Sequence, residues 1–443
     1  MSARDVESRR LRLAPVAWGY ADGVPAEAET DPSLSPAGNE QVLELLHELL
    51  RRSHMSTPSD LALITADQAR SIGARDVVLY LIDYEQSALV PVPGDAVSRA
   101  TPLSVAGTVA GRAFSSTAIL RSKGDVPGQQ RLYLPLLDGT ERLGVIGMSF
   151  AEGALSEPIV AACERYAHLV AMLIVTKGAY GDAFEVVRRR QRMTIASELV
   201  WALVPPLVFA TDGVALAGML EPCYDNGGDA LDYAVDDRVL HLGVFDAMGH
   251  GLAAAGVAAF ALSAYRYSRR SGSDLLETYA AMHEAVGRQF PDRRFVTALI
   301  GQLELDSGRL RWISAGHPPP LIIRGGRRAH PLKTTPVPPL GVDSPRGAPT
   351  VATDALEPGD LLLLYTDGLS EARDPDGEMF TIERLSEFIE REAAAGQTAP
   401  ETLRRLRHAV IGRGATELRD DATALLLEWQ GGREAALMPQ TVL

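Results

Sequence analysis

The segment GGDALDYAVDDRVLHLGVFDAMGHG, residues 227–251, decides the fold of the C-terminal half of this 443-residue chain. Two runs rich in β-forming residues, Ala230–Val235 and Val239–Phe245, are joined by a short polar turn. This pattern predicts an antiparallel hairpin with acidic residues at its strand ends. A helix is predicted directly after it, over Gly251–Arg270.

The two outer acids of this hairpin are predicted to lie on one face. With Asp236-Asp237 as a two-residue turn, Asp229 faces Val244. Asp246 lies two residues further along, so its side chain points to the same side of the strand. The two residues are then diagonal neighbours, about 7–8 Å apart at the backbone. At this spacing two carboxylates can reach a shared cation.

Further acids lie at the ends of other predicted strands. Asp367 follows the buried-looking run Leu361–Leu364, and Asp420-Asp421 precedes the predicted strand Ala422–Trp429. Carboxylates brought together repel one another unless a cation lies between them. Mg²⁺ and Mn²⁺ prefer oxygen ligands. We therefore expect a site for two divalent ions, which can activate a bridging water and clamp a phosphoryl group.

Each of these residues also has a plain structural interpretation. Asp beside Gly is a common turn composition, so Asp229 or Asp420 taken alone fits a turn better than a ligand. The pair on one hairpin face supports the two interpretations about equally. His250 and His317 are better interpreted as residues of tight turns than as catalytic residues. Arg293-Arg294 is better interpreted as a solvent-exposed pair than as a pair that steers a phosphate.

Composition and charge restrict the functional class. The net charge of −14 argues against a nucleic-acid partner, because phosphate contacts dominate such binding. The most apolar stretches, Leu169–Val175 and Ala253–Ala264, are too short or too rich in small residues for a membrane span of about 20 residues. The start, Met1–Leu13, does not resemble a secretory signal. Two cysteines, Cys163 and Cys223, form no disulfide framework, so we expect a cytoplasmic protein.

The length predicts roughly two or three domains. Residues 1–37, with four prolines, are expected to be a flexible leader. Residues 38–177 begin and end with helices and have strands between them, which predicts an α/β sandwich; Thr57 is the expected N-cap of its second helix. Residues 207–431 combine antiparallel hairpins with paired helices and predict a layered α+β fold, followed by a flexible tail, 432–443.

Residues 178–206 are predicted to form a helical linker. One continuous helix is expected over Phe184–Val204, ended by Pro205-Pro206. Its arginines are interpreted as a solvated face. Seven-residue spacing of three apolar residues hints at a coiled coil through which the chain could form a homodimer. These residues are Val186, Met193 and Val200.

The C-terminal half resembles the SpoIIE-like branch of the metal-dependent PP2C-type serine/threonine phosphatases, which includes the RsbU-type stress regulators. The resemblance covers about Val204–Trp429 and rests on seven motifs in the order of the family. They are Glu198-Leu199-Val200-Trp201 with Pro205-Pro206, Gly227-Gly228-Asp229, Asp246–Gly251, Phe295-Val296-Thr297, Ala315-Gly316-His317-Pro318, Tyr365-Thr366-Asp367-Gly368 and Asp420-Asp421-Ala422-Thr423.

The resemblance implies a fold and a ligand set. The fold is a β-sandwich flanked by helices, an αββα arrangement. The implied ligands of two Mn²⁺ or Mg²⁺ ions are Asp229, Asp246, the backbone carbonyl of Ala247, Asp367 and Asp420. Whether Asp420 or its neighbour Asp421 is the ligand stays open in the sequence.

The N-terminal half resembles a GAF sensory domain over about Asn39–Thr176, on looser motifs. They are Val77–Ile82, Gly107–Phe114 and Leu132–Phe150. Taken together, the two resemblances imply a phosphoprotein phosphatase regulated by a sensor, whose substrate class is a phosphorylated anti-anti-sigma (STAS-type) regulator. The ligand of the sensor is not indicated by the sequence.

Two other functional classes compete with this interpretation. A non-catalytic scaffold of GAF and pseudophosphatase domains is disfavoured by the complete set of acids. A nucleotide cyclase also holds two metals on paired aspartates, but Asp367 and Asp420-Asp421 have no role in that chemistry.

Overall fold

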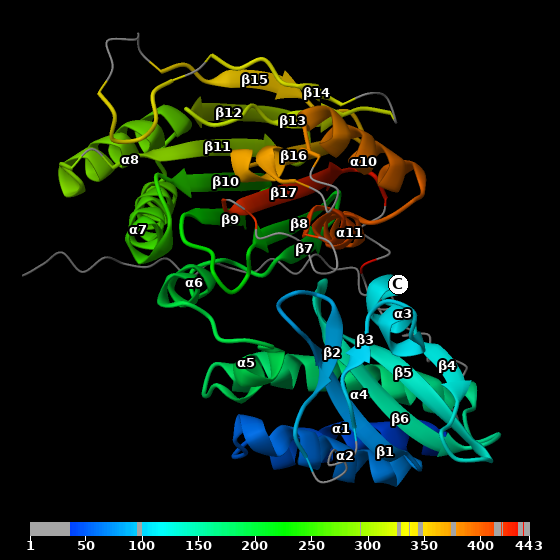
Figure 1. Cartoon of the computed structure of the whole chain (residues 1–443). Coiled ribbons are helices and arrows are strands. Elements are labelled where there is room, and N and C mark those ends of the chain that lie inside the picture. Colours follow the sequence, from blue (N-terminus) through cyan, green and yellow to red (C-terminus); the bar gives the residue numbers. More distant parts are fainter. Residues whose placement is uncertain are drawn as a thin grey trace, which may run out of the picture.

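The computed structural model describes residues 36–94, 100–292, 294–325, 329–335, 337–343, 349–373, 378–411, 418, 420–432 and 437 (Figure 1). Residues 1–35 of the expected leader, Arg293, and all but Gly432 and Leu437 of the expected tail lie outside this range.

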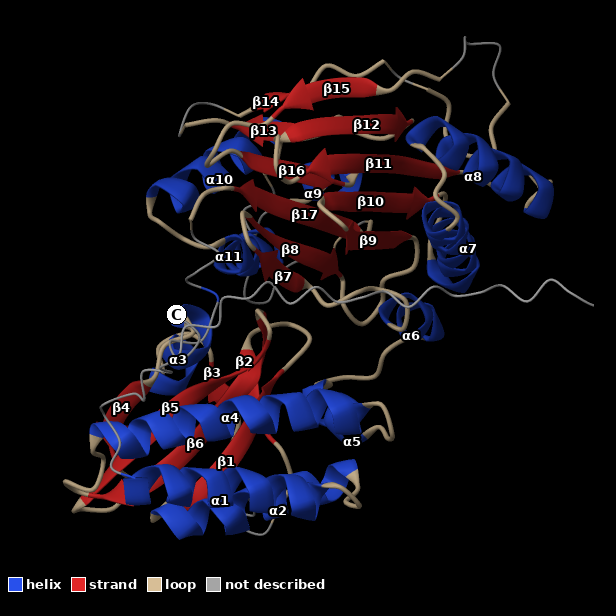
Figure 2. Ribbon diagram, turned by 180° about the vertical axis from the view of Figure 1, so that it is seen from behind, coloured by secondary structure: helices blue, strands red, loops and turns tan. Residues whose placement is uncertain are grey.

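The N-terminal domain is a six-stranded antiparallel sheet, in the order β3-β2-β1-β6-β5-β4. Helices α1, α2 and α4 cover one face of this sheet (Figure 2), and α3 packs on the other. This arrangement confirms the predicted α/β sandwich. The elements are α1 Pro36–Ser53, α2 Leu61–Ala69, β1 Arg75–Ile82, β2 Ala88–Pro91, β3 Leu103–Ser104, α3 Val109–Ser116, β4 Leu120–Lys123, β5 Gln129–Asp138, β6 Glu141–Ala151 and α4 Glu157–Gly178.

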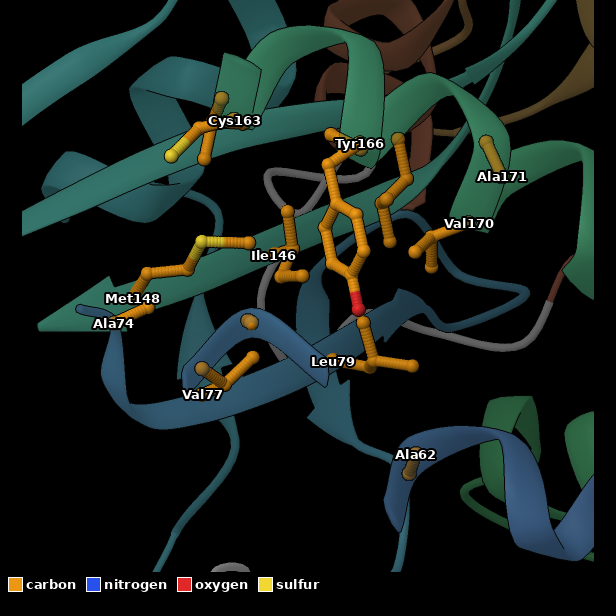
Figure 3. Packing of buried hydrophobic residues seen from close by; sticks show 14 of the residues in the cluster. Ala62, Ala74, Val77, Leu79, Ile146, Met148, Cys163, Tyr166, Val170 and Ala171 are labelled. Carbon is orange, nitrogen blue, oxygen red and sulfur yellow. The ribbon is translucent and has the colours of Figure 1, made fainter. Parts of the chain in front are cut away.

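Helix α4 carries much of the N-terminal core. Cys163, Tyr166 and Val170 point from α4 onto side chains of the sheet, including Leu79 and Ile146 (Figure 3). The buried hydroxyl of Tyr166 donates a hydrogen bond of 2.8 Å to the carbonyl oxygen of Thr65 in α2. This bond satisfies the one polar group of the ring, so the ring can be buried without a desolvation penalty for its hydroxyl.

Helix α4 is also the one described helix long and apolar enough to cross a membrane. Length and composition are weak evidence of a span, because the core helix of a soluble protein meets the same criteria. Eight residues of α4 are buried within the domain.

Two capping residues set the start of helices here. Thr57 forms a capping box with Asp60, whose carboxylate accepts from the amide of Thr57 at 2.9 Å. The predicted N-cap at Thr57 is therefore confirmed, although the helix begins as the 3₁₀ turn Pro58–Asp60 and then continues as α2. Thr108 caps α3 by accepting from the amide of Gly111 at 2.9 Å.

The predicted continuous linker helix is wrong. The structure has two short helices, α5 Ala183–Arg188 and α6 Ile195–Trp201, and Arg189 between them is extended, with φ −90° and ψ 122°. A new N-cap explains the break: the hydroxyl of Thr194 accepts from the amide of Ser197 at 3.2 Å.

The heptad positions accordingly do not share one helical face. Val186 in α5 is 65% exposed, whereas Val200 in α6 is 2% exposed and belongs to the core of the C-terminal domain. The spacing of seven residues therefore reports two unrelated apolar positions rather than a coiled-coil seam within this chain.

The C-terminal domain is a sandwich of two antiparallel sheets with a helix pair on each outer face (Figure 1), as predicted. One sheet has the order β15-β12-β11-β10-β9 and is covered by α7 and α8, and the other has the order β14-β13-β16-β17-β8-β7 and is covered by α10 and α11. The elements are β7 Val208–Thr211, β8 Val214–Glu221, β9 Asp229–Asp236, β10 Val239–Ala247, α7 Gly251–Arg270, α8 Leu275–Gln289, β11 Val296–Glu304, β12 Arg309–Ala315, β13 Leu321–Ile323, β14 His330–Pro331, β15 Ala352–Ala355, β16 Leu361–Tyr365, α9 Asp367–Glu371, α10 Ile382–Ala394, α11 Ala399–Ile411 and β17 Ala422–Trp429.

Three apolar layers hold this domain together. Leucines and two tryptophans of both sheets, among them Trp312 and Trp429, form the layer between the sheets. A second layer lies under α7 and α8, and a third lies under α10 and α11. Because strands β16 and β17 are apolar on both faces, they contribute to two layers at once. This explains why these strands lack the alternation of a solvent-facing strand.

Candidate metal centre

Asp229 and Asp246 lie directly opposite each other on neighbouring strands. The predicted pairing of Asp229 with Val244 is wrong, because Asp236 pairs with Val239 and the turn consists of Asp237-Arg238. Asp237 adopts a left-handed conformation, φ 50°, which Asp tolerates better than most residues. The shift by two residues keeps both acids on one face, as predicted, but makes them direct partners, typically 4.5–5.5 Å apart at Cα.

Asp229 is the buried end of the cluster. Its side chain is 1% exposed, and one carboxylate oxygen accepts a hydrogen bond of 2.7 Å from the hydroxyl of Thr366. The same hydroxyl accepts from the amide of Thr423 at 2.9 Å. Thr366 thereby ties Asp229, on one sheet, to the ends of β16 and β17 on the other.

Asp367 and Asp420 form the exposed rim of the cluster. Asp367 opens α9 directly after β16, and Asp420 lies just before β17. Gly368 permits their close approach: a Cβ atom at this position would lie 1.9 Å from the carbonyl oxygen of Asp421. The backbone of the Thr366–Gly368 turn therefore packs directly against the Asp420-Asp421 turn.

The carboxylates of Asp421 and Asp420 make different hydrogen bonds. Its carboxylate is 8% exposed and accepts hydrogen bonds from the amides of Gly227 and Gly228, at 2.9 and 2.5 Å. A buried carboxylate with two backbone donors holds the glycine turn that precedes Asp229. Asp420, in contrast, accepts from the amide of Asp421 at 2.9 Å and is otherwise turned to the rim.

The two glycines of that turn are required by space. A Cβ atom at Gly227 would lie 2.2 Å from the backbone nitrogen of Gly251, and one at Gly228 would lie 2.9 Å from the carbonyl oxygen of Ala247. The amide of Ala247 donates to the carbonyl of Gly228 at 3.0 Å. The carbonyl oxygen of Ala247 is thus held at the acid cluster, beside Asp421 and Asp229.

The carboxylates raise one another's pKa values. Burial, together with Asp246 and Asp421, raises the pKa of Asp229 well above its usual range. Burial, Asp367 and Asp420 raise the pKa of Asp246 to about 7. Partial burial and Asp420 also raise the pKa of Asp367. A group of oxygen ligands that resist ionising together is one that a divalent cation would stabilise.

The donor set fits a hard divalent cation by its chemistry. All members are carboxylate or carbonyl oxygens, and they come from the ends of four strands at one edge of the sandwich. Among the described residues, no group of three or more His, Cys, Asp or Glu side chains is already placed so that it could hold a metal ion. An open and partly solvated arrangement suits ions such as Mg²⁺, which keep several waters in their shell.

His317 is a positioning residue of the cluster that the sequence did not reveal. It is 6% exposed, and its Nε2 lies 2.9 Å from the carbonyl oxygen of Tyr365, so Nε2 carries the proton. Its Nδ1 then accepts the hydroxyl of Thr297 at 2.8 Å, and that hydroxyl oxygen lies 3.4 Å from Asp246. Burial lowers the pKa of His317 to about 4, which keeps the ring neutral.

Two other candidates play no part in this network. His250 occupies the N-cap position of α7 but makes no side-chain cap, and it is exposed. Arg294 donates to Asp292 at 2.8 Å. Arg293 lies outside the described residues.

The family comparison covers most of this site. Residues 236–430 match the model of the family described as Stage II sporulation protein E, SpoIIE. The matched segment contains Asp246, Ala247, Asp367 and Asp420, whereas Asp229 precedes it.

Known proteins give partial matches to this chain. Protein IcfG of Synechocystis is 36% identical over 95 residues, which is 21% of this chain and 15% of the length of IcfG. The RsbU and RsbW domains of a Mycobacterium tuberculosis protein match 49% of this chain and 62% of theirs, with 27% identity and a TM-score of 0.43. The phosphatase domain of Bacillus subtilis SpoIIE, with a fragment of its regulatory domain, matches 72% of this chain and 85% of its own, with 15% identity and a TM-score of 0.41. On the family match, residues 236–430 are similar to the SpoIIE domain of PP2C-type protein phosphatases.

Proposed function

We propose that the chain hydrolyses phosphoserine or phosphothreonine in a protein substrate, using divalent ions held by the strand-end acids. The single observation that carries this proposal is the convergence of Asp229, Asp246, Asp367 and Asp420 from both sheets at one edge of the sandwich. The pairing of a buried acid with exposed rim acids leaves one side of the cluster open to a substrate.

The ligands we assign are Asp229, Asp246, the carbonyl of Ala247, Asp367 and Asp420. Two bound Mn²⁺ or Mg²⁺ ions supply a water of lowered pKa and positive charge for the phosphoryl oxygens. The chain's own residues supply the positions: Thr366 holds Asp229, and the pair Thr297–His317 lies behind Asp246. We place Asp421 behind the site rather than among the ligands, because two backbone amides already donate to its Oδ2.

The substrate we propose is a phosphorylated STAS-type regulatory protein in a cytoplasmic partner switch. This assignment rests on the resemblance of the seven motifs to the RsbU-type branch. A scaffold without activity would leave the buried acids with no partner for their charge. A nucleotide cyclase needs one pair of aspartates for its two metals. That function would leave Asp367 and Asp420, the acids at the exposed rim of the cluster, without a role.

The N-terminal domain is proposed to be a GAF sensor that acts through α6. Helix α6 packs on α7, and Arg266 of α7 donates to the carbonyl of Leu203 at 2.6 Å. Helix α7 begins at Gly251, just after the short segment that follows Asp246 and Ala247 at the end of β10. A displacement of α6 would therefore reach the ligand-bearing end of β10 through one helix.

The experiment that tests the proposed function is phosphate release from a phosphorylated STAS-type regulator. The full chain should release phosphate with Mn²⁺ or Mg²⁺, lose this activity in EDTA and regain it on addition of metal. Asp229→Asn should be inactive. Asp306→Asn is the matched control, because Asp306 is a surface acid of the same domain and pairs with Arg238.

Each other function has its own outcome in the same experiment. A scaffold would bind the phosphorylated regulator without releasing phosphate, and a cyclase would convert ATP or GTP to a cyclic product. Phosphate release that survives exhaustive chelation would contradict the metal-dependent mechanism.

A further inference from the structure

Arg142, at the start of β6, is a buried cation at the junction of the two domains. Its side chain is 3% exposed, and neither Nε nor Nη1 has a hydrogen-bond partner. The nearest carboxylate oxygen, Oε2 of Glu401 in α11, lies 3.8 Å from Nη1. The guanidinium stacks on Phe114, with its Cζ 4.8 Å from the ring centroid. A buried guanidinium with unused donors needs a ligand or water to satisfy it.

The neighbouring acids are already engaged. Glu401 binds Arg404 through two contacts of 2.7 Å and Arg405 through one of 2.9 Å. Glu141 accepts from the amide of Val208 at 2.6 Å, and burial raises its pKa. Glu401 therefore already pairs with two other arginines, and burial lowers the pKa of Arg142 to about 10.

A cavity of about 310 Å³ opens beside Arg142 at this junction. A smaller cavity of about 20 Å³ shares part of its wall. Residues that line both are Tyr84, Gln86, Arg142, Trp201, Leu207 and Val208. Gln86 is a second residue with an unsatisfied polar atom, because its Oε1 is buried without a hydrogen-bond partner. The larger volume is within the range of small-molecule sites, which have apolar walls and a few polar anchors.

Four acids line the cavity together with Arg142 and a second cation, Arg188. They are Asp83, Asp138, Glu141 and Glu185, and three of them have other hydrogen-bond partners. Asp83 accepts from the amides of Ser87 and Ala88, at 2.7 and 3.1 Å. Glu185 accepts the hydroxyl of Tyr84. The aromatic rings of Tyr84, Phe114 and Trp201 give the rest of the wall its apolar character.

We propose that this interdomain cavity binds a small organic anion, with a carboxylate on Arg142 and an apolar or aromatic body against Tyr84, Phe114 and Trp201. Arginine suits this task because its planar fork matches a carboxylate in two parallel hydrogen bonds. The occupant contacts the β1–β2 turn, α6 and the start of β7, so it touches both domains and the linker at once. This inference does not depend on the chemistry at the acid cluster.

Three probes of one shape and different charge test the proposal on the full chain: benzoate, benzyl alcohol and benzylamine. Titration calorimetry or ligand-observed NMR should show benzoate binding at least tenfold more tightly than either of the others. Arg142→Met, which keeps the length and the apolar stem, should reduce benzoate affinity at least tenfold. The matched control is Arg131→Met, because Arg131 is also buried in the N-terminal domain but bonds to Ser149 and stacks on Tyr133. Equal affinity for benzoate and benzyl alcohol, or unchanged benzoate binding in Arg142→Met, overturns the proposal.

Thermal unfolding separates a binding role from a structural one. If Arg142 held the domains together through Glu401, Arg142→Met would lower the melting temperature. The proposal expects an equal or higher melting temperature without ligand, because Glu401 keeps Arg404 and Arg405 and an unsatisfied buried cation is removed. A clear loss of stability together with unchanged benzoate binding would assign Arg142 to structure alone.

Discussion

The acid cluster and the arginine junction both contain buried charged side chains, but they differ in how much water reaches them. Asp367 and Asp420 form an exposed rim around the buried Asp229. Arg142 is 3% exposed and faces a cavity walled by aromatic rings. A partly open set of oxygen ligands suits a hydrated divalent ion. A closed guanidinium among apolar walls suits an organic anion.

The two regions are also held in place by different means. The acids are fixed by short hydrogen bonds from hydroxyls and backbone amides at strand ends, such as those of Thr366, Gly227 and Gly228. The junction is formed by long arginine side chains of α11 and β6, which share the carboxylate of Glu401. We therefore expect removal of one ligand charge to abolish function at the acid end, and removal of the Arg142 charge to leave the fold intact at the junction.

The largest effect is expected from Asp246→Asn. Loss of one charged oxygen from the cluster should reduce phosphate release more than 100-fold, beyond the about 10–100-fold typical of an outer-sphere partner. The chelated variant should unfold at the same temperature as the chelated parent or higher, because repulsion with Asp367 and Asp420 is relieved. Steady-state kinetics and calorimetry measure the two quantities. Near-normal turnover would remove Asp246 from the ligand set.

The next comparison sets Asp421→Ala against Asp420→Ala. Asp421→Ala leaves the amides of Gly227 and Gly228 without their acceptor, at a cost of about 1–3 kcal/mol for each buried donor. Asp420→Ala loses one local hydrogen bond at an exposed position, so its free energy of unfolding should change little while its metal affinity falls.

Denaturant unfolding of the chelated proteins and metal titration of the folded proteins measure the two effects. The reverse pattern, with Asp420→Ala unstable and Asp421→Ala deficient only in metal binding, would exchange the two assignments.

A smaller effect is expected on the pH dependence of stability without metal. The pKa of Asp246 in the folded chain is raised to about 7, above its unfolded value near 4, so the folded state binds this proton more tightly. The stability contributed by that proton is complete below about pH 4 and is lost as the pH rises towards 7. Bound metal should therefore raise the melting temperature more at pH 8 than at pH 5.5.

Asp246→Asn supplies the control for this pH dependence. Its chelated form should lose less stability between pH 5 and pH 8 than the chelated parent, since the residue that titrates is gone. Equal slopes in the two proteins would assign the pH dependence to other groups.

The placement of the acids at strand ends was largely predictable from sequence, whereas the junction was not. Asp229 and Asp246 lie on one hairpin, where a period of two fixes their common face, and the error of two residues in register left that face unchanged. Asp367 and Asp420 could be recognised because each adjoins an apolar strand and a turn.

Contacts distant in sequence account for what the sequence could not show. Arg142 and Glu401 are brought together only by the docking of two domains, and His317 reaches Tyr365 only across the sandwich. The linker prediction was wrong for the same reason: helical periodicity continues through Arg189, but the cap at Thr194 and the contact of its amide with the carbonyl of Tyr224 at 3.0 Å begin a new element.

The smallest expected effect tests whether the junction communicates with the acid end. Trp201 of α6 donates to the carbonyl of Cys223 at 2.8 Å, and its ring lies 4.8 Å from that of Tyr84 in the N-terminal domain. Trp201→Phe removes the donor and keeps the ring, which should cost about 1 kcal/mol of unfolding free energy. Because α6 packs on α7, we also expect the apparent metal affinity to change, by about fivefold or less. About fivefold is the lower end of the coupling usually found between two sites in one protein.

Trp429→Phe is the matched control for this prediction. Trp429 donates to the carbonyl of Leu305 at 3.0 Å within the core between the two sheets, so the same chemical change is made away from the junction. It should cost similar stability and leave the metal titration unchanged. If Trp201→Phe behaves in the same way as Trp429→Phe, with lost stability and an unaltered metal titration, then α6 is a tether, and occupancy of the junction cavity is not transmitted to the acids through this helix.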